Sequence, residues 1–215
     1  MFRATDLAGF WDYNGLCLEG AAASVGVDTL VHTADVRLGD LDHRRVEVDD
    51  EAAGARLRPG FEALGWTAER LAWMRYAGPA PPGPAFPEVP FAATRDLRVE
   101  WTRSALPSAR EGVVRALALQ EELAAERRGS RALLADGGFA IFLVHGDAAE
   151  IDQVYVTPEA RGHGLGGALV TSAVRAAGAA ETFIVAEDGG RAQRLYARLG
   201  FDPVWRQHTF TRRPG

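Results

Sequence analysis

Six prolines between residues 79 and 90 decide how this 215-residue chain can be divided. Proline fixes the backbone φ angle and has no N–H group to donate, so a segment this rich in proline forms neither a helix nor a central strand. We therefore predict a proline-rich linker over 79–96 between a smaller α/β N-terminal domain, 1–78, and a larger domain, 97–212. The first domain is acidic, with 8 Arg and 13 Asp or Glu, whereas 91–215 has 16 Arg and 15 acidic residues.

All 24 cationic side chains are arginine, because the chain contains no lysine. This excludes a Walker A phosphate loop and Schiff-base chemistry, which both need a lysine amine. The net charge of -5 argues against nucleic acid or an anionic membrane as a partner, and no apolar run is long enough to span a bilayer. A lone Cys17 cannot form an internal disulfide, which favours a reducing cytoplasm, and the histidines have no ligand spacing, so we expect no metal site. We expect a monomer or homodimer.

Hydrophobic periodicity and turn residues predict a mixed sheet in the second domain. The predicted strands cover 97–102, 132–135, 139–144, 150–156, 182–186 and 201–211. The predicted helices cover 108–128, 164–177 and 192–199. The first helix should begin at an N-cap, Ser108, and end at Gly129.

The connections between these elements set the fold class. Asp136-Gly137-Gly138 is a hairpin signal, so the strands around it and the next strand should form an antiparallel meander. A helix with a short return then joins 150–156 to 182–186, which requires a right-handed crossover and a parallel pair. We predict an α+β fold with a mixed, mostly antiparallel sheet, one parallel strand pair and flanking helices.

A glycine-rich loop joins the predicted strand 150–156 to the helix that follows it. Four of the six residues in 162–167 are glycine. Glycines let the backbone approach a ligand closely, and a helix N-terminus offers unpaired N–H groups and the positive end of the helix dipole. The loop therefore suits a pyrophosphate.

Two classes of phosphate ligand remain open for this loop. Gly162, Gly164 and Gly167 match the G-x-G-x-x-G fingerprint of nicotinamide dinucleotide enzymes, and Glu187 lies about 20 residues further on, where a ribose-binding acid is expected. In that fingerprint, however, the first glycine directly follows the strand within a parallel unit. Here residues 157–161 intervene and the preceding strands form a meander.

The loop instead resembles the acetyl-CoA loop of the GNAT superfamily of N-acetyltransferases, whose hallmark is Arg or Gln, two residues, Gly, one residue, then Gly or Ala. Arg161, Gly164 and Gly166 match this hallmark. A second segment, 192–201, is similar to the family's A-x-x-L-Y-x-x-x-G-F helix and turn. The two motifs occur in the order that the family requires, and the resemblance covers about 115 residues.

This resemblance implies acetyl-CoA as the acyl donor. It also implies that strands 150–156 and 182–187 splay apart and that the pantetheine arm pairs with the backbone between them. The implied cofactor-binding residues are Val154, Val156, Arg161, Gly162, His163, Gly164, Leu165, Gly166 and Gly167. His163 also fits an exposed spacer, and Gly189 stands where the family often has an Asn that contacts cofactor or substrate.

Acyl transfer to an amine requires a proton donor for the leaving thiolate and an acceptor for the amine proton. Tyr196 matches the family's usual general acid, although it also fits a core position on the apolar side of its helix. Glu150 and Asp152 are candidate bases, because strand alternation places them on the same face as Val154 and Val156. Solvated rim carboxylates are the competing interpretation.

The first domain contains a possible repeat of this pattern. Residues 46–66 echo the order of strand, helix, Leu-Gly-aromatic and strand, with Phe61 where Tyr196 would be and with no Arg-x-x-Gly-x-Gly before it. This indicates a degenerate, truncated GNAT half, as in tandem members, or a coincidence of a common helix end. The leading function is acetyl transfer to a primary amine of a small molecule or peptide. The alternatives are a non-catalytic acyl-CoA-binding module and a nicotinamide dinucleotide enzyme.

Overall fold

A computed structural model describes residues 1–4, 11–20, 24–107 and 109–213. The chain forms two compact units. Unit 1 comprises 1–73, 186–190 and 204–215, and unit 2 comprises 74–185 and 191–203. This division differs from the predicted domains, because unit 1 includes the end of the chain and the proline-rich segment belongs to unit 2.

The described residues of unit 1 form two α-helices and a sheet. The helices are α1 (Val27–Arg37) and α2 (Glu51–Ala63), and a short 3-10 turn is η2 (Trp11–Tyr13). The strands β1 (Phe2–Arg3), β2 (Asn14–Leu18) and β3 (Arg44–Val48) lie entirely in this unit. Three further strands contribute residues to both units, namely β4 (Thr67–Tyr76), β9 (Glu181–Glu187) and β10 (Asp202–Arg212).

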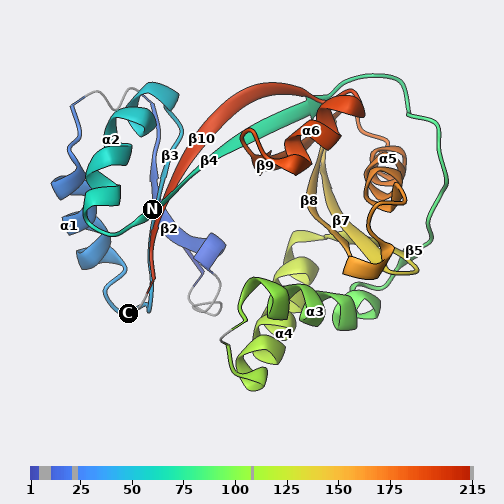
Figure 1. Cartoon of the computed structure of the whole chain (residues 1–215), viewed down its shortest axis with the longest axis horizontal. Helices are drawn as coiled ribbons and strands as arrows, with labels where there is room; N and C mark the ends of the chain where they lie inside the picture. The colour runs from blue at the N-terminus through green and yellow to red at the C-terminus, as the bar shows by residue number, and fades with distance from the viewer. Residues whose placement is uncertain (5–10, 21–23, 108, 214–215) are drawn as a thin grey trace. The chain divides into compact units, whose positions relative to one another are not determined.

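The strand order in unit 1 is β1-β2-β3-β10-β4, in which β2 and β3 are parallel and β3 and β10 are antiparallel. Both helices lie on one face of β2 and β3 (Figure 1). The core between them is apolar, with the rings of Phe61 and Phe210 stacked at a centroid distance of 4.2 Å and Trp66 packed edge-on against Phe61. Burial of these large rings is the main stabilisation of this unit.

Unit 2 holds the predicted meander. Its strands are β5 (Glu88–Val89), β6 (Arg131–Ala135), β7 (Gly138–His145) and β8 (Ala148–Val156). The helical segments are η3 (Phe91–Thr94), α3 (Arg95–Ala105), α4 (Glu111–Arg128), η4 (Pro158–Ala160), α5 (Leu165–Ala177) and α6 (Arg191–Arg198). The strands β5 to β8 are antiparallel neighbours, and β8 and β9 are parallel. The predicted α+β fold with a mixed sheet is therefore confirmed.

Helices cover the strands of unit 2. Helix α5 packs against β7 and β8, and α3 packs against α4 (Figure 1). The predicted stop at Gly129 is confirmed, because this residue ends α4 in the left-handed conformation with φ 68°. Helix α4 begins at Glu111, after Arg110, whereas the predicted N-cap Ser108 lies outside the described residues.

The predicted strand over 97–102 is wrong, because these residues form most of α3. Their polar and apolar residues alternate, but the same residues also satisfy a helical period. Arg98 and Thr102, four residues apart, are buried, and Leu97 and Trp101 pack against the apolar cluster around Phe139. Tertiary packing selected the helical period.

The proline-rich segment does not run freely. The Arg175 guanidinium of α5 donates to the carbonyl oxygens of Pro81, at 2.9 Å, and of Pro84. The backbone N–H of Phe86 donates to the Ser172 hydroxyl at 3.1 Å. The segment therefore lies along α5 within unit 2, and its residues 79–87 form neither helix nor strand. Across the described part of the chain, no helix is both long and apolar enough to cross a membrane.

The first and second halves of the sequence share one element order, and we call these two halves the first and second repeats. In the first half, β2, α1, β3, α2 and β4 follow one another, as do β8, α5, β9, α6 and β10 in the second half. The helix ends agree in detail. The N–H of Trp66 donates to the Phe61 carbonyl at 3.0 Å, and the N–H of Phe201 donates to the Tyr196 carbonyl at 3.0 Å. Gly65 and Gly200 both have positive φ, 75° and 93°.

Candidate active site

Strands β8 and β9 separate halfway along their length. Their paired residues run from Ala148 with Glu181 to Ile151 with Ile184. Beyond that point, β8 continues to Val156 and β9 to Glu187. The predicted opening between these two strands is therefore present in the backbone.

A β-bulge lies where β8 leaves β9. On β7, Ile141 is opposite Gln153 and the next residue, Phe142, is opposite Ile151, so Asp152 is the extra residue of the bulge. A bulge bends its strand and increases the local twist. It also breaks the alternation of side chains, so the prediction that Glu150 and Asp152 share one face with Val154 and Val156 is wrong.

The glycine-rich loop prepares the N-terminus of α5 for a ligand. Gly162 and Gly164 have φ of 84° and 83°, which side chains other than glycine rarely adopt. A Cβ atom at either position would meet open space. The first backbone bond of α5 runs from the Ala168 N–H to the Gly164 carbonyl at 3.0 Å, so the N–H groups before Ala168 are available to an anion.

A pocket of about 610 Å³ lies over this loop. It is lined by β8, the loop, the start of α5 and one side of α6. The lining residues include Val154, Val156, Arg161, Gly162, Gly164, Leu165, Gly166, Gly167 and Tyr196, together with the unpredicted Arg191 and Arg198. His163 is exposed and outside this lining, as an external spacer would be.

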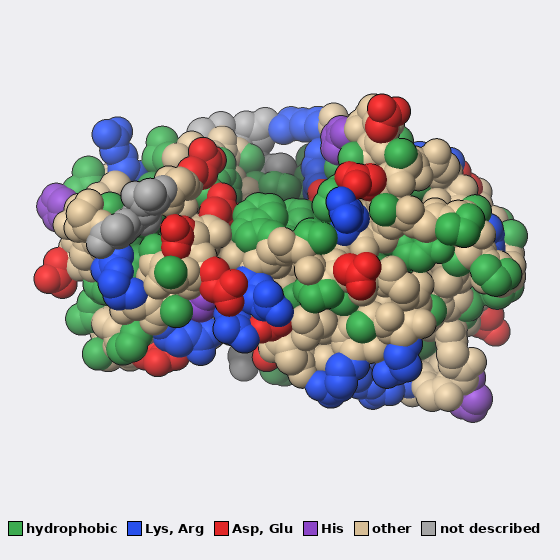
Figure 2. Space-filling view, turned by 90° about the horizontal axis from the view of Figure 1, so that it is seen from above, with side chains coloured by type: hydrophobic (Ala, Val, Ile, Leu, Met, Phe, Trp, Pro, Cys, Tyr) green, Lys and Arg blue, Asp and Glu red, His purple; other side chains and the backbone are tan. Residues whose placement is uncertain are grey.

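Arginine supplies the positive charge of this pocket. Arg161, Arg191 and Arg198 are exposed and line it. The Arg161 Nε also donates to the Val156 carbonyl at 3.0 Å, which holds its side chain across the end of β8. In Figure 2 every blue side chain is an arginine, because the chain has no lysine, and basic and acidic side chains are interspersed over the visible face.

Tyr196 lies between this pocket and a second cavity. Its side chain is 8 % exposed, and burial raises the pKa of its hydroxyl. The second cavity, of about 200 Å³, borders the same tyrosine. Its lining residues are Trp101, Phe139, Asp152, Gln153, Val154, Tyr155, Val185 and Tyr196. We refer to it below as the small cavity.

The two candidate bases lie in different surroundings. Asp152 is exposed, lines the small cavity and accepts from Arg128 at 3.2 Å. Glu150 lies outside the lining of both cavities, in the paired part of β8. Burial, and then the neighbouring Asp152 carboxylate, raise the pKa of Glu150. Of the two carboxylates, Asp152 is therefore the one beside Tyr196.

Sequence reasoning missed the contribution of α3. Trp101 lines the small cavity, and the Glu100 carboxylate accepts from the Tyr155 hydroxyl at 2.8 Å. Burial and this acceptor raise the pKa of Tyr155 to about 12. A helical reading of 97–102 would have placed Leu97 and Trp101 together on one side and drawn attention to Trp101.

Comparison with known proteins shows what this fold, and the segment that carries the pocket, are similar to. A family model described as "Acetyltransferase (GNAT) domain" matches residues 120–203, which include β8, the glycine-rich loop and α6. These residues are therefore similar to a GNAT acetyltransferase domain. No curated protein matches the chain.

Solved structures show the same fold at low identity. A functionally unknown conserved protein from Staphylococcus epidermidis ATCC 12228 matches with a TM-score of 0.73 and 12% identity, covering 97% of this chain and 88% of the other. A tandem GNAT protein from the clavulanic acid biosynthesis pathway matches with a TM-score of 0.58 and 18% identity, covering 91% of this chain and 72% of the other. A GCN5-related N-acetyltransferase from Sphaerobacter thermophilus matches with a TM-score of 0.56 and 20% identity, covering 90% of this chain and 70% of the other.

Proposed function

We propose that this protein transfers an acetyl group from acetyl-CoA to a primary amine of a small molecule or peptide. One observation supports this proposal above the others. The buried Tyr196 lines both cavities. The larger pocket lies over a loop with the features of a phosphate-binding loop, and the small cavity is lined by the carboxylate of Asp152. Donor and acceptor would then meet at a proton donor.

The residues of the larger pocket fit an acyl-CoA. Gly162 and Gly164 leave open space at the turn, and the start of α5 presents backbone N–H groups to a pyrophosphate. Arg191 and Arg198 line the pocket from α6 and would neutralise phosphate charge. The unpaired part of β8, including Val154 and Val156, offers backbone groups to an extended ligand between the strands.

The ammonium first loses one proton. The amine nitrogen then forms a bond to the acetyl carbonyl carbon, the carbon–sulfur bond breaks, the thiolate takes a proton, and the nitrogen loses its second proton as the amide forms. Tyr196 would supply the proton to the thiolate, since its raised pKa keeps it protonated at neutral pH, and the tyrosinate would recover a proton from the nitrogen. Asp152 would take the proton that the ammonium loses, directly or through water.

The first repeat, from β2 to β4, is proposed to be degenerate and to lack catalytic residues. Phe61 stands at the position of Tyr196 and is fully buried, so it has no proton to give. The sequence between β2 and α1 contains no Arg-x-x-Gly-x-Gly. We therefore assign the acyl-CoA site to unit 2 alone.

The test is a screen of primary amines with acetyl-CoA that measures release of free thiol, together with calorimetry of CoA binding. Thiol release that depends on both substrates is expected. Binding of CoA without thiol release for any amine or peptide would indicate an acyl-CoA-binding module. A melting temperature raised by a nicotinamide dinucleotide and unchanged by CoA would contradict the proposal.

A further inference from the structure

The small cavity has aromatic walls. Phe139 and Tyr155 are buried, with ring centroids 5.9 Å apart, and Tyr196 and Trp101 complete the aromatic lining. Aromatic ring faces attract cations and also accommodate apolar groups. The volume of about 200 Å³ corresponds to about seven water-sized groups. This space suits a compact molecule.

Among the described residues, the one charged residue in the lining of the small cavity is Asp152, which forms an ion pair with Arg128. Asp152 lines it directly, and Glu100 is held 2.8 Å from the Tyr155 hydroxyl. Arg128 donates to one oxygen of Asp152 at 3.2 Å, and a carboxylate can accept from a second donor as well. A primary ammonium group placed between Asp152 and the aromatic rings would satisfy both the carboxylate and the ring faces.

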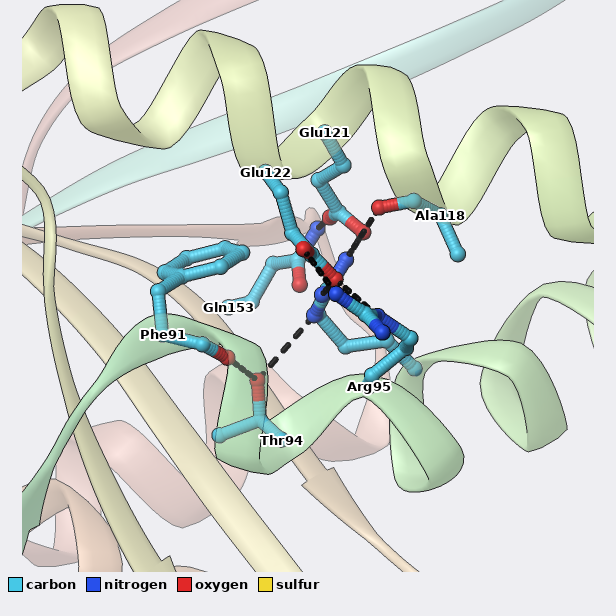
Figure 3. A network of polar contacts seen from close by, with 8 residues as sticks. Phe91, Thr94, Arg95, Ala118, Glu121, Glu122 and Gln153 are labelled. Atoms are coloured by element: carbon cyan, nitrogen blue, oxygen red, sulfur yellow. Dashed lines mark hydrogen bonds and ion pairs between the residues drawn. The ribbon is translucent and has the colours of Figure 1, made fainter.

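A buried polar network fixes the walls of the small cavity (Figure 3). The guanidinium of Arg98, fully buried on α3, donates to the Ala118 carbonyl and the Glu121 carboxylate of α4, both at 2.8 Å. Glu121 in turn accepts from the Gln153 amide on β8. The network therefore ties α3, which carries Trp101, to the strand that carries Asp152 (residue 152 directly precedes Gln153).

Resting on the proposed acetyl transfer, we propose that the small cavity is the acceptor site and selects a small primary monoamine with a compact apolar group. Asp152 receives the ammonium, and Trp101 limits the size of the apolar group. Because Arg98 and Glu121 tie α3 to α4 and β8, we expect this wall to resist the widening that a peptide lysine with its flanking residues would need. Within the proposed function, this favours small molecules over peptides.

The test is an acceptor series that runs from propylamine through phenethylamine to a lysine-containing peptide. Wild type should favour the small amines over the peptide by at least tenfold in kcat/KM. Trp101→Ala should raise kcat/KM for bulkier amines at least tenfold relative to propylamine, with KM for acetyl-CoA unchanged. Asp152→Asn should raise KM for every amine at least tenfold. Asp147→Asn, an exposed carboxylate in the β7–β8 turn, is the matched control.

Folding is checked separately by the melting temperature, and Trp101→Phe provides a milder second variant in which the size shift should be smaller but in the same direction. Amine binding is also measured by NMR with CoA present, so that it does not depend on turnover. A preference of wild type for the peptide, or an unchanged size profile in both Trp101 variants, overturns the proposal. Asp152-dependent binding of small amines without any thiol release supports this acceptor site and rejects acetyl transfer.

Discussion

Tyr196 and Phe61 occupy the same place in two helix ends that share one hydrogen-bond pattern. Both side chains are buried in an aromatic cluster, Tyr196 near Phe201 and Phe61 against Phe210. The apolar requirement of the position is therefore met by either ring. The hydroxyl of Tyr196 needs a further explanation, and its position between the two cavities of unit 2 supplies one.

Tyr196→Phe should lower turnover by about 10²-fold or more, the scale of general acid catalysis, because the change removes the hydroxyl and keeps the ring. CoA affinity, measured by calorimetry, should be unchanged. Tyr76→Phe is the control, since its hydroxyl donates to the Pro79 carbonyl away from both cavities. Near-normal turnover of Tyr196→Phe, in an assay limited by the chemical step, would make Tyr196 a core residue.

Gly166→Ala should weaken CoA binding at least tenfold and leave the melting temperature nearly unchanged. A Cβ at residue 166 would lie 3.7 Å from Val156 and 3.8 Å from Leu195, which is ordinary contact, but it would occupy the pocket at the start of α5. Gly112→Ala, in open space on α4, is the matched control. If calorimetry gives Gly166→Ala the CoA affinity of the wild type, the pyrophosphate does not bind at the N-terminus of α5.

At the scale of elements, the sequence allowed the loop, the helix ends and the parallel pair to be predicted, because these depend on local glycine and on short connections. Helix α3 was mispredicted since alternation over six residues cannot distinguish a strand from an amphipathic helix. Arg98 decided the outcome, and its burial depends on Glu121, which is 23 residues away in sequence. Similarly, the bulge at Asp152 depends on β7 and has no local signal.

Arg98→Met should lower the free energy of unfolding by about 3–5 kcal/mol, because it leaves the buried Glu121 carboxylate without its cation. Adding Glu121→Met should recover part of this loss, which a denaturant titration of both variants would measure. Arg95→Met is the control, because Arg95 also forms an ion pair, with Glu122, but is exposed. This substitution should lower the free energy of unfolding much less. Equal losses for Arg95→Met and Arg98→Met would contradict the structural role of the buried network.

At the scale of the whole molecule, two buried histidines of unit 1 couple stability to pH. Burial lowers the pKa of both His43 and His208, and Arg58 and Arg70 lower that of His208 further. The folded chain therefore holds both rings neutral, while the unfolded chain binds protons near the ordinary pKa of about 6.5. Stability from these residues is present above that value and is lost as the pH falls below it.

The free energy of unfolding should accordingly fall between pH 7 and pH 5.5, with a slope of up to about 1.4 kcal/mol per pH unit for each histidine. His43→Gln with His208→Gln should flatten this slope, whatever the absolute stability of the variant. His32→Gln, on the exposed side of α1, should leave it unchanged. Denaturant titrations across this range measure the slope, and a wild-type slope in the double variant would contradict the assignment.

The two compact units do not coincide with the two repeats, because unit 1 also contains most of β10, the last strand of the second repeat. In the sheet, β3 is followed by β10, the last strand of the second repeat, and β4, the last strand of the first, lies beside β9. The predicted boundary near residue 78 followed the prolines, which mark the sequence position between the repeats. The strands that pair, such as β3 and β10, lie far apart in the sequence on either side of the proline-rich segment. The prolines therefore could not predict this pairing.

A fragment that begins at residue 79 should therefore fail to fold, although it contains every residue of the acyl-CoA pocket. It lacks β4, whose Met74 is fully buried in unit 2 and whose Arg75 pairs with Glu181 at 3.0 Å. Tyr76 is also lost, and its ring packs at 5.3 Å from that of Phe201, next to the end of α6 that carries Tyr196.

Circular dichroism and CoA calorimetry of the fragment would measure both effects. A second fragment that begins at residue 66 contains β4, so it should show more helical signal and bind CoA more tightly than the fragment that begins at residue 79. Cooperative unfolding and CoA binding by the shorter fragment would show that unit 2 needs no strand from the first repeat.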